Sequence, residues 1–431
     1  MLEKTPQSIK DVALRDPSAS ASHFGFSSIP RNVASGSVVT FVVFAYCLSF
    51  SALIFSGPLA PGLHYGVVSA LVSAAAGCLL VPLLSTIPVA IAGPDTPPVA
   101  VLAAMAFGIS QSLGMDAGPT PVIGTVVLAL ALTTLITGFT LYMIGYFRLA
   151  TWMRFIPYPV IAGFLAASGW FLATGAYRVM TGDDFALSDL HSTFSDRNLP
   201  LWGAGLGFAV VLALLRRAIS SSLVVPLALF VAFILVLAGI HLGGYSLDEA
   251  RAAGWLFEAP PGKFMALPWG AVSLSALQPA VFLSLVPEML AVAVVTAMAI
   301  LLNATGYEVS QHTNVDLDSE MRASGVANLF AAGGGGIVAN LSYNRSLLNL
   351  SAGATGPMSA TVCGLLCLAL VFTGPSIIGF VAAPILGGLL FYLGAAVLQT
   401  WVVRFFRRIG WSDYLLILAI LFLIVKFGYL A

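Results

Sequence analysis

Charged side chains are scarce in this sequence. Lys, Arg, Asp and Glu make up 8% of the 431 residues, while 59% of the residues are hydrophobic. An average soluble domain carries about 25% charged residues. None of these four residue types occurs in residues 32–94 or 117–147, and a helix needs about 20 apolar residues to cross a bilayer. The scarcity of charge excludes a soluble globular protein and indicates a polytopic membrane protein.

Several other signatures are also missing. The formal net charge is zero, so there is no electrostatic basis for binding nucleic acid. The sequence contains no Walker-type loop, zinc-ligand spacing or nucleophile elbow, so we expect no enzyme activity, no metal and no cofactor. Residues 1–31 are polar and lack the apolar core of a secretory signal, and we expect them to form a cytoplasmic tail. The four cysteines lie in apolar segments and are interpreted as small core side chains: Cys47, Cys78, Cys363 and Cys367.

Apolar runs between helix breakers predict thirteen helical segments. They cover residues 34–55, 66–88, 97–113, 121–146, 157–180, 200–215, 221–241, 286–306, 318–332, 345–355, 357–374, 379–401 and 412–430. Segments 97–113 and 345–355 are too short to cross a membrane alone. Each follows a cluster of breakers, Gly-Pro-Asp-Thr-Pro-Pro at 93–98 and four glycines at 333–336.

The basic residues are unevenly distributed between the predicted loops, and cytoplasmic loops usually carry the excess of Lys and Arg. With the N-terminus inside, twelve fall inside: Lys4, Lys10, Arg15, Arg31, Arg148, Arg154, Arg216, Arg217, Arg322, Arg404, Arg407 and Arg408. Five fall outside: Arg178, Arg197, Arg251, Lys263 and Lys426. This distribution predicts a cytoplasmic N-terminus.

The two halves of the chain place their interrupted helices at similar positions. The first half begins near Pro30 and reaches Asp95 about 65 residues later, and the second begins near Pro287 and reaches Arg345 about 58 residues later. An odd number of spans separates the two starts, so the halves are expected to be inverted. We predict a first repeat at 32–241, an outside loop at 242–285 and a second repeat at 286–431. Paired broken helices in inverted halves indicate a transporter binding site.

The breakers at the two short helices carry the polar residues of the predicted site. Free N–H groups at two facing helix N-termini attract an anion. Arg345 is the only basic residue placed inside the membrane, and it would add a positive charge. An alternative is that Arg345 forms a structural ion pair with Asp95, because ionisable groups in membranes usually pair. The predicted substrate-binding residues are Asp95, Thr96, Asn344, Arg345, Ser346 and, on the first span, Tyr46.

Several motifs in order along residues 30–430 resemble the sulfate-permease (SulP) family of anion transporters. They are Ala-Gly-Pro-Asp at 92–95, Pro-Tyr-Pro-Val-Ile-Ala-Gly-Phe at 157–164, Ser-Glu-Met at 319–321, Gly-Val-Ala-Asn-Leu at 325–329, Asn-Arg-Ser at 344–346 and Asn-Leu-Ser-Ala-Gly-Ala at 349–354. The resemblance implies an all-α polytopic membrane protein of two inverted seven-helix repeats, divided into core and gate domains. It implies an anion site between the third and tenth helices and an elevator-like motion of core against gate.

The sequence departs from the family pattern in three ways. Many bacterial members carry a coupling carboxylate in the eighth helix, where this chain has Ala299. Members usually continue into a fourteenth helix after a stretch like Gly-Tyr-Leu at 428–430, and often into a cytoplasmic STAS domain. We therefore expect helix 14 to be absent from the second repeat and the STAS domain to be absent from this chain. Either the chain is a shortened form of a longer protein, or the count of thirteen segments misses one span.

The leading hypothesis is a secondary active transporter or exchanger of a small anion in a bacterial inner membrane or an equivalent bilayer. Sulfate, bicarbonate, dicarboxylates and chloride remain open as substrates, and a homodimer is a possible assembly. One alternative is a nucleobase-type permease of the same fold, which Ala299 and Arg345 disfavour. The other is a membrane sensor or scaffold with little transport.

Overall fold

The computed structural model describes residues 28–113, 119–155, 157–183, 195, 197–219, 221, 223–258, 267–272, 279–373, 378–404, 406 and 409–427. Its main helices are α1 (Ile29–Ile54), α2 (Leu63–Leu84), α3 (Thr96–Leu113), α4 (Pro119–Tyr146), α5 (Tyr158–Thr181), α7 (Asn198–Ala218), α8 (Val224–Leu242), α11 (Val286–Gln311), α12 (Leu317–Gly333), α13 (Tyr343–Ser351), α14 (Met358–Thr373), α16 (Ala383–Leu398) and α17 (Trp411–Phe427). Shorter elements are η4 (Gly57–Gly62), β1 (Ala92–Gly93), η5 (Ala150–Phe155), α9 (Leu247–Ala252), η6 (Pro268–Ala271), α10 (Pro279–Ser284), β2 (Asn340–Leu341) and the π-helical η8 (Gln399–Val403).

Each of the thirteen segments predicted from the sequence overlaps one main helix. Within the described ranges, nine helices are long and apolar enough to cross a membrane, judged by length and composition. The expectation that 97–113 is too short was wrong by this measure, because α3 begins at Thr96 and runs for 18 residues. Prolines are tolerated in the first turn of a helix, so Pro97 and Pro98 do not delay its start. Helix α13 has only nine residues.

Local sequence explains where several helices begin and end. The side chain of Asp316 caps α12 by accepting hydrogen bonds from the N–H groups of Asp318 and Ser319. Helix α5 ends at Gly182, whose φ of +83° is the left-handed conformation that glycine adopts at low cost. The start of α12 and the end of α5 are therefore set by residues of the local sequence.

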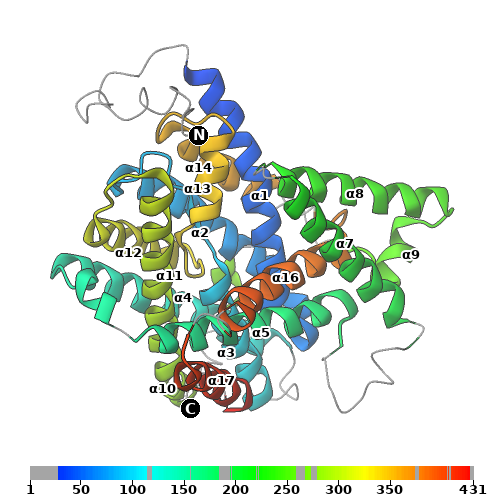
Figure 1. Ribbon diagram of the computed structural model, residues 1–431. Coiled ribbons are helices and arrows are strands. Elements are labelled where there is room, and N and C mark those ends of the chain that lie inside the picture. The colour runs from blue at the N-terminus through cyan, green and yellow to red at the C-terminus, as the bar shows by residue number, and fades with distance from the viewer. Residues whose placement is uncertain are drawn as a thin grey trace, which may run out of the picture.

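The helices pack into two groups, which we name the core group and the gate group (Figure 1). The core group contains α1–α4 and α11–α14, and the gate group contains α5, α7, α8, α16 and α17. Within each group the helices contact one another extensively, while the main contacts between groups are α3 with α5 and α1 with α5 and α16. In Figure 1, α7 and α8 lie on one side, α11 and α12 lie on the other, and α1 passes between them.

Packing pairs repeat when the two halves are exchanged. Helix α1 packs on α14 as α11 packs on α4, and α2 packs on α14 as α12 packs on α4. In the gate group, α16 packs on α7 as α5 packs on α17. The fold is therefore an all-α architecture built from two inverted repeats.

The predicted outside loop, 242–285, contains the short elements α9, η6 and α10. A capping box between Ser246 and Glu249 starts α9. The residues after α9 run antiparallel to the chain that leads into α16, with a bridge between Leu256 and Ala382. This segment is thus attached to the gate group.

Candidate functional site

The two strand–helix units of the core group meet through a short antiparallel ladder. Strand β1 pairs with β2 in the register Ala92 with Leu341 and Gly93 with Asn340. The N–H of Ser342 extends the ladder by donating to the carbonyl of Ile91 at 2.9 Å. Helices α3 and α13 begin directly after these strands, at Thr96 and Tyr343. The ladder supplies hydrogen bonds to backbone that could not remain unpaired in hydrocarbon, and it holds the two helix N-termini side by side.

Arg345 is buried at the start of α13, with 2% of its surface exposed. Its Nη2 donates to the carbonyl of Gly93 at 3.2 Å, and its guanidinium carbon lies 5.8 Å from the centroid of the Tyr46 ring. Its Nε and Nη1 have no hydrogen-bond partner in the described part of the chain. A buried cation without a counter-ion is costly, so this geometry favours an anion beside Arg345.

Asp95 lies between β1 and α3 and is partly exposed. Its Oδ2 accepts a hydrogen bond of 3.3 Å from Nδ2 of Asn303, which also donates to the carbonyl of Leu341 at 2.9 Å. The structural ion pair between Asp95 and Arg345, considered above, does not occur among the described residues. Asp95 is therefore held by α11, and Arg345 by β1 and α1.

The other predicted site residues occupy different positions. Thr96 is buried at the start of α3, with 8% exposure, and Asn344 is exposed. Tyr46 stacks on Phe50 with their ring centroids 5.7 Å apart. Ser346 is fully buried: its Oγ donates to the carbonyl of Ser342 and accepts from the N–H of Ile91. Arg345 and Tyr46 are thus in contact, and Ser346 supports the ladder.

Two residues of the β1–β2 ladder, Asn340 and Gly93, were not identified as site residues from the sequence. Asn340 is fully buried, and neither polar atom of its amide has a partner in the described part of the chain. A Cβ on Gly93 would lie 3.2 Å from Nη1 of Arg345. Residues paired across a ladder project to the same face, so Asn340 lies on the face that Arg345 occupies. In the sequence, Asn340 could have been noticed as an isolated polar residue in the apolar run 337–341.

The framework around the ladder uses more buried polar groups. Asn328 donates to and accepts from the backbone of Ala339, at 2.7 and 2.8 Å. Asn349 donates to the carbonyl of Val89 and to Ser359, and it accepts from Ser35. These bonds connect α1, α12, α13 and α14 around β1 and β2, so the ladder is fixed from several sides.

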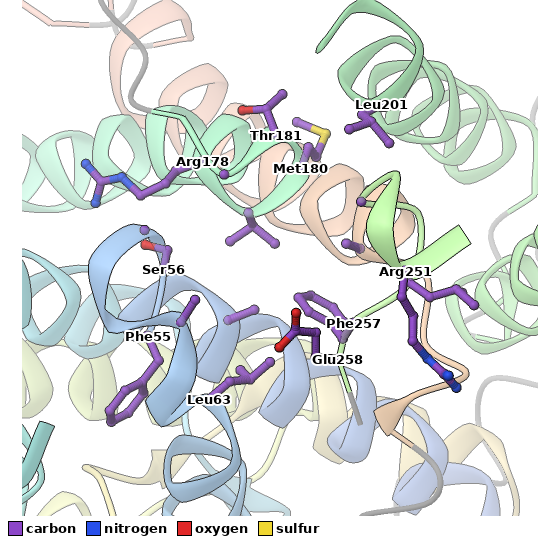
Figure 2. Close-up of a pocket in the computed structure, with 18 of the residues that line it drawn as sticks. Phe55, Ser56, Leu63, Arg178, Met180, Thr181, Leu201, Arg251, Phe257 and Glu258 are labelled. Atoms are coloured by element: carbon purple, nitrogen blue, oxygen red, sulfur yellow. The ribbon is translucent and has the colours of Figure 1, made fainter. Parts of the chain in front are cut away.

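A cavity of about 560 Å³ lies away from Arg345, where α1 and α5 end (Figure 2). It is lined by residues of both packing groups, among them Ala52 and Phe55 from the core group and Met180 and Leu201 from the gate group. Ala52 is six residues beyond Tyr46 on α1, which corresponds to about 9 Å along the helix axis. The cavity therefore opens between core and gate on one side of the candidate site.

The fold and this site define an integral, multi-pass membrane protein of transporter architecture. Within the described ranges, no group of three or more His, Cys, Asp or Glu side chains could hold a metal ion. Residues 29–420 match the Sulfate permease family. The chain belongs to this family of membrane transporters.

The chain is also similar to individual proteins. Over 330 residues, 74% of this chain, the sequence is 27% identical to the vacuolar basic amino acid transporter VSB1 of Saccharomyces cerevisiae. The chain spans only 31% of that relative's length. The transmembrane domain of BicA, a bicarbonate transporter of a cyanobacterium, superposes with a TM-score of 0.73 at 16% identity, covering 94% of this chain and 97% of that one. The structure of SLC26A9 has a TM-score of 0.69 at 12% identity, covering 92% of this chain and 62% of that one. At these identities the structural similarity concerns the fold.

Proposed function

We propose that the protein is a secondary active transporter or exchanger of a small anion, bound between the N-termini of α3 and α13. The observation that carries the proposal is the buried guanidinium of Arg345, whose Nε and Nη1 have no partner in the described part of the chain. A bound anion would accept from these nitrogens and complete the charge balance. The bicarbonate transport named for BicA supports the same class of substrate.

The arrangement of the helices supports an alternating-access mechanism. Arg345, Asp95 and Tyr46 all belong to the core group, and contacts between the groups are fewer than contacts within them. The core group can therefore carry the anion past the gate group as a unit, in an elevator-like motion. The excess of Lys and Arg in the loops on the side of the N-terminus supports an orientation in which the N-terminus lies in the cytoplasm.

Uptake into liposomes tests the proposal. The purified chain should accumulate labelled sulfate, bicarbonate, chloride or a dicarboxylate, and Arg345→Ala should abolish that uptake because a neutral site leaves the anion without its cation. The exposed Arg404 provides a matched control, and Arg404→Ala should transport normally. Anion uptake that is unchanged in Arg345→Ala would refute the proposal. If uracil is taken up saturably and none of the anions is transported, the protein is instead a nucleobase permease.

A second candidate substrate is an amino acid, taken up as a species with both a carboxylate and an ammonium group. The specific observation is Asp95, a carboxylate that does not pair with Arg345 within the described part of the chain. The ammonium group would bind Asp95 and the carboxylate would bind Arg345. The relative named as a basic amino acid transporter supports this arrangement. Labelled lysine or arginine should then be taken up, and Asp95→Asn should abolish that uptake while leaving inorganic anions transported.

A further inference from the structure

The cavity where α1 and α5 end is placed to be an access vestibule, an inference that rests on the proposed transport function. One wall comes from the end of α1, η4 and the start of α2, and the other from α5, α7 and the segment after α9. Its volume of about 560 Å³ is within the range of small-molecule sites, roughly 300–1,000 Å³. Because core and gate each supply one wall, a solute that approaches the central site from this end passes between these residues.

Two of the arginines that line the cavity are used to hold its walls. The guanidinium carbon of Arg178 lies 4.4 Å from the ring centroid of Phe107 on α3, so it connects gate to core. Arg251 forms a salt bridge of 2.6 Å with Asp248 and donates to the carbonyl of Gly379. In Figure 2 both side chains extend away from Glu258, toward opposite sides of the view.

Glu258 differs from these arginines in position and in partners. Its side chain is exposed and lies among the apolar residues that line the cavity, close to Phe257 in Figure 2. Among the described residues it has no hydrogen-bond or salt-bridge partner. Its carboxylate is thus available to act on any charged solute in the cavity.

We infer that Glu258 is a specificity-determining residue at the outer vestibule, where its negative charge opposes anions in proportion to their valence. The arginines of the lining, including the exposed Arg197, attract anions into the same space. A charge in a cleft changes the local concentration of ions through the field it creates. Glu258 therefore offsets part of this attraction, and the offset is about twice as large in energy for a divalent anion as for a monovalent one.

The local potential can be measured without transport. Ala60 is exposed and lines the cavity, so Ala60→Cys provides a thiol there, while the native cysteines are all buried. The thiol is reacted in the full chain with two membrane-impermeant methanethiosulfonates, one carrying a sulfonate and the other a trimethylammonium group. Glu258→Gln should raise the rate of the anionic reagent and lower that of the cationic reagent, by about two-fold each for a unit charge some 8 Å away in water.

Controls separate charge from structure. Glu258→Asp keeps the charge and should preserve the ratio of the two rates, as should Asp413→Asn, which changes an exposed carboxylate outside the cavity lining. The effect should nearly vanish in 1 M salt, where the Debye length is about 3 Å. A rate ratio that Glu258→Gln leaves unchanged, or one that does not respond to salt, would overturn the inference whether or not the protein transports anions.

Uptake provides the second readout. If Glu258→Gln lowers the KM of a monovalent anion by a certain factor, it should lower that of a divalent anion by about the square of this factor, because the interaction energy is proportional to charge. Equal factors for both would contradict selection by valence. If the wild type takes up no anion at all, the proposed function is refuted. The ratio of the two methanethiosulfonate reaction rates would still test the role of Glu258.

Discussion

The units β1–α3 and β2–α13 are equivalent in topology but differ in length and charge. Helix α3 has 18 residues, follows Asp95 and packs on α5 of the gate group, whereas α13 has nine residues, carries Arg345 and packs on α1 and α11. The inverted repeat sets the backbone of both units, and the side chains then make one end acidic and the other basic. For the proposed anion substrate, this difference gives the site a direction, toward the side of Arg345.

The two charged residues also differ in how they are held. Asp95 is partly exposed and bonds to Asn303, while Arg345 is buried and keeps two nitrogens unpaired within the described part of the chain. A charge that is already solvated or paired gains little from a ligand, whereas a buried unpaired charge gains much. The comparison predicts that changes on the α13 side have larger effects than changes on the α3 side.

After the loss of uptake expected for Arg345→Ala, the largest effect is expected when the shape of the cation changes. Arg345→Lys keeps the charge but loses the planar fork and the bond to Gly93, and Lys is a poor substitute at such sites. We expect kcat/KM for anion uptake to fall by about ten- to a hundred-fold, the equivalent of one charged hydrogen bond. Arg404→Lys is the control, and wild-type kinetics in Arg345→Lys would show that only charge matters.

Ser346→Ala should weaken the ladder itself. The N–H of Ile91 would lose its acceptor in a fully buried position, so we expect the free energy of unfolding in detergent to fall by about 1–3 kcal/mol. Ser351→Ala, at the exposed end of the same helix, should leave stability unchanged. Full stability in Ser346→Ala, together with lost uptake, would instead make Ser346 a substrate ligand.

Gly93→Ala should act on Arg345 from the β1 side. The new Cβ would stand 3.2 Å from Nη1, and the guanidinium would have to shift by a few tenths of an ångström, so we expect anion affinity to fall by roughly three- to ten-fold, about 0.7–1.4 kcal/mol. Gly108→Ala in α3 is a matched control, because nothing lies within 4 Å of its Cβ position. Binding can be measured by calorimetry; equal affinities in the two variants would show that Arg345 tolerates the displacement.

The smallest effect is expected at Asp95 for an inorganic anion. Asp95→Asn removes a repulsive charge without changing size, so affinity for a monovalent anion should rise by about two-fold, the effect of a unit charge some 10 Å away in water. The same binding assay measures it, with Asp413→Asn as the control. A fall in affinity would contradict the assignment of Arg345 alone as the attracting charge.

Much of this fold could be predicted from the sequence, because a helix that crosses a bilayer must be a long run of apolar residues. Apolar runs, breaker clusters and basic loops located thirteen helices and both interruptions, and motifs such as Asn-Arg-Ser at 344–346 indicated the family. Segment 97–113 was expected to be too short to cross a membrane, whereas α3 begins one residue earlier and runs for 18 residues; Pro97 and Pro98 lie in its first turn, where proline is tolerated. The roles of Asn303, Asn340 and Gly93 depend on contacts between distant segments, which no local pattern contains.

The sequence by itself therefore determined that the chain spans a membrane repeatedly and where its two helices are broken, because each span must bury its backbone within its own hydrogen bonds. It also predicted that Arg345 is a basic side chain placed at membrane depth, away from the loops. Only the tertiary structure decided that Asp95 bonds to Asn303 and that, among the described residues, no carboxylate pairs with Arg345. The physical reason is that pairing depends on distances of a few ångströms between helices from the two repeats, and these are set by packing.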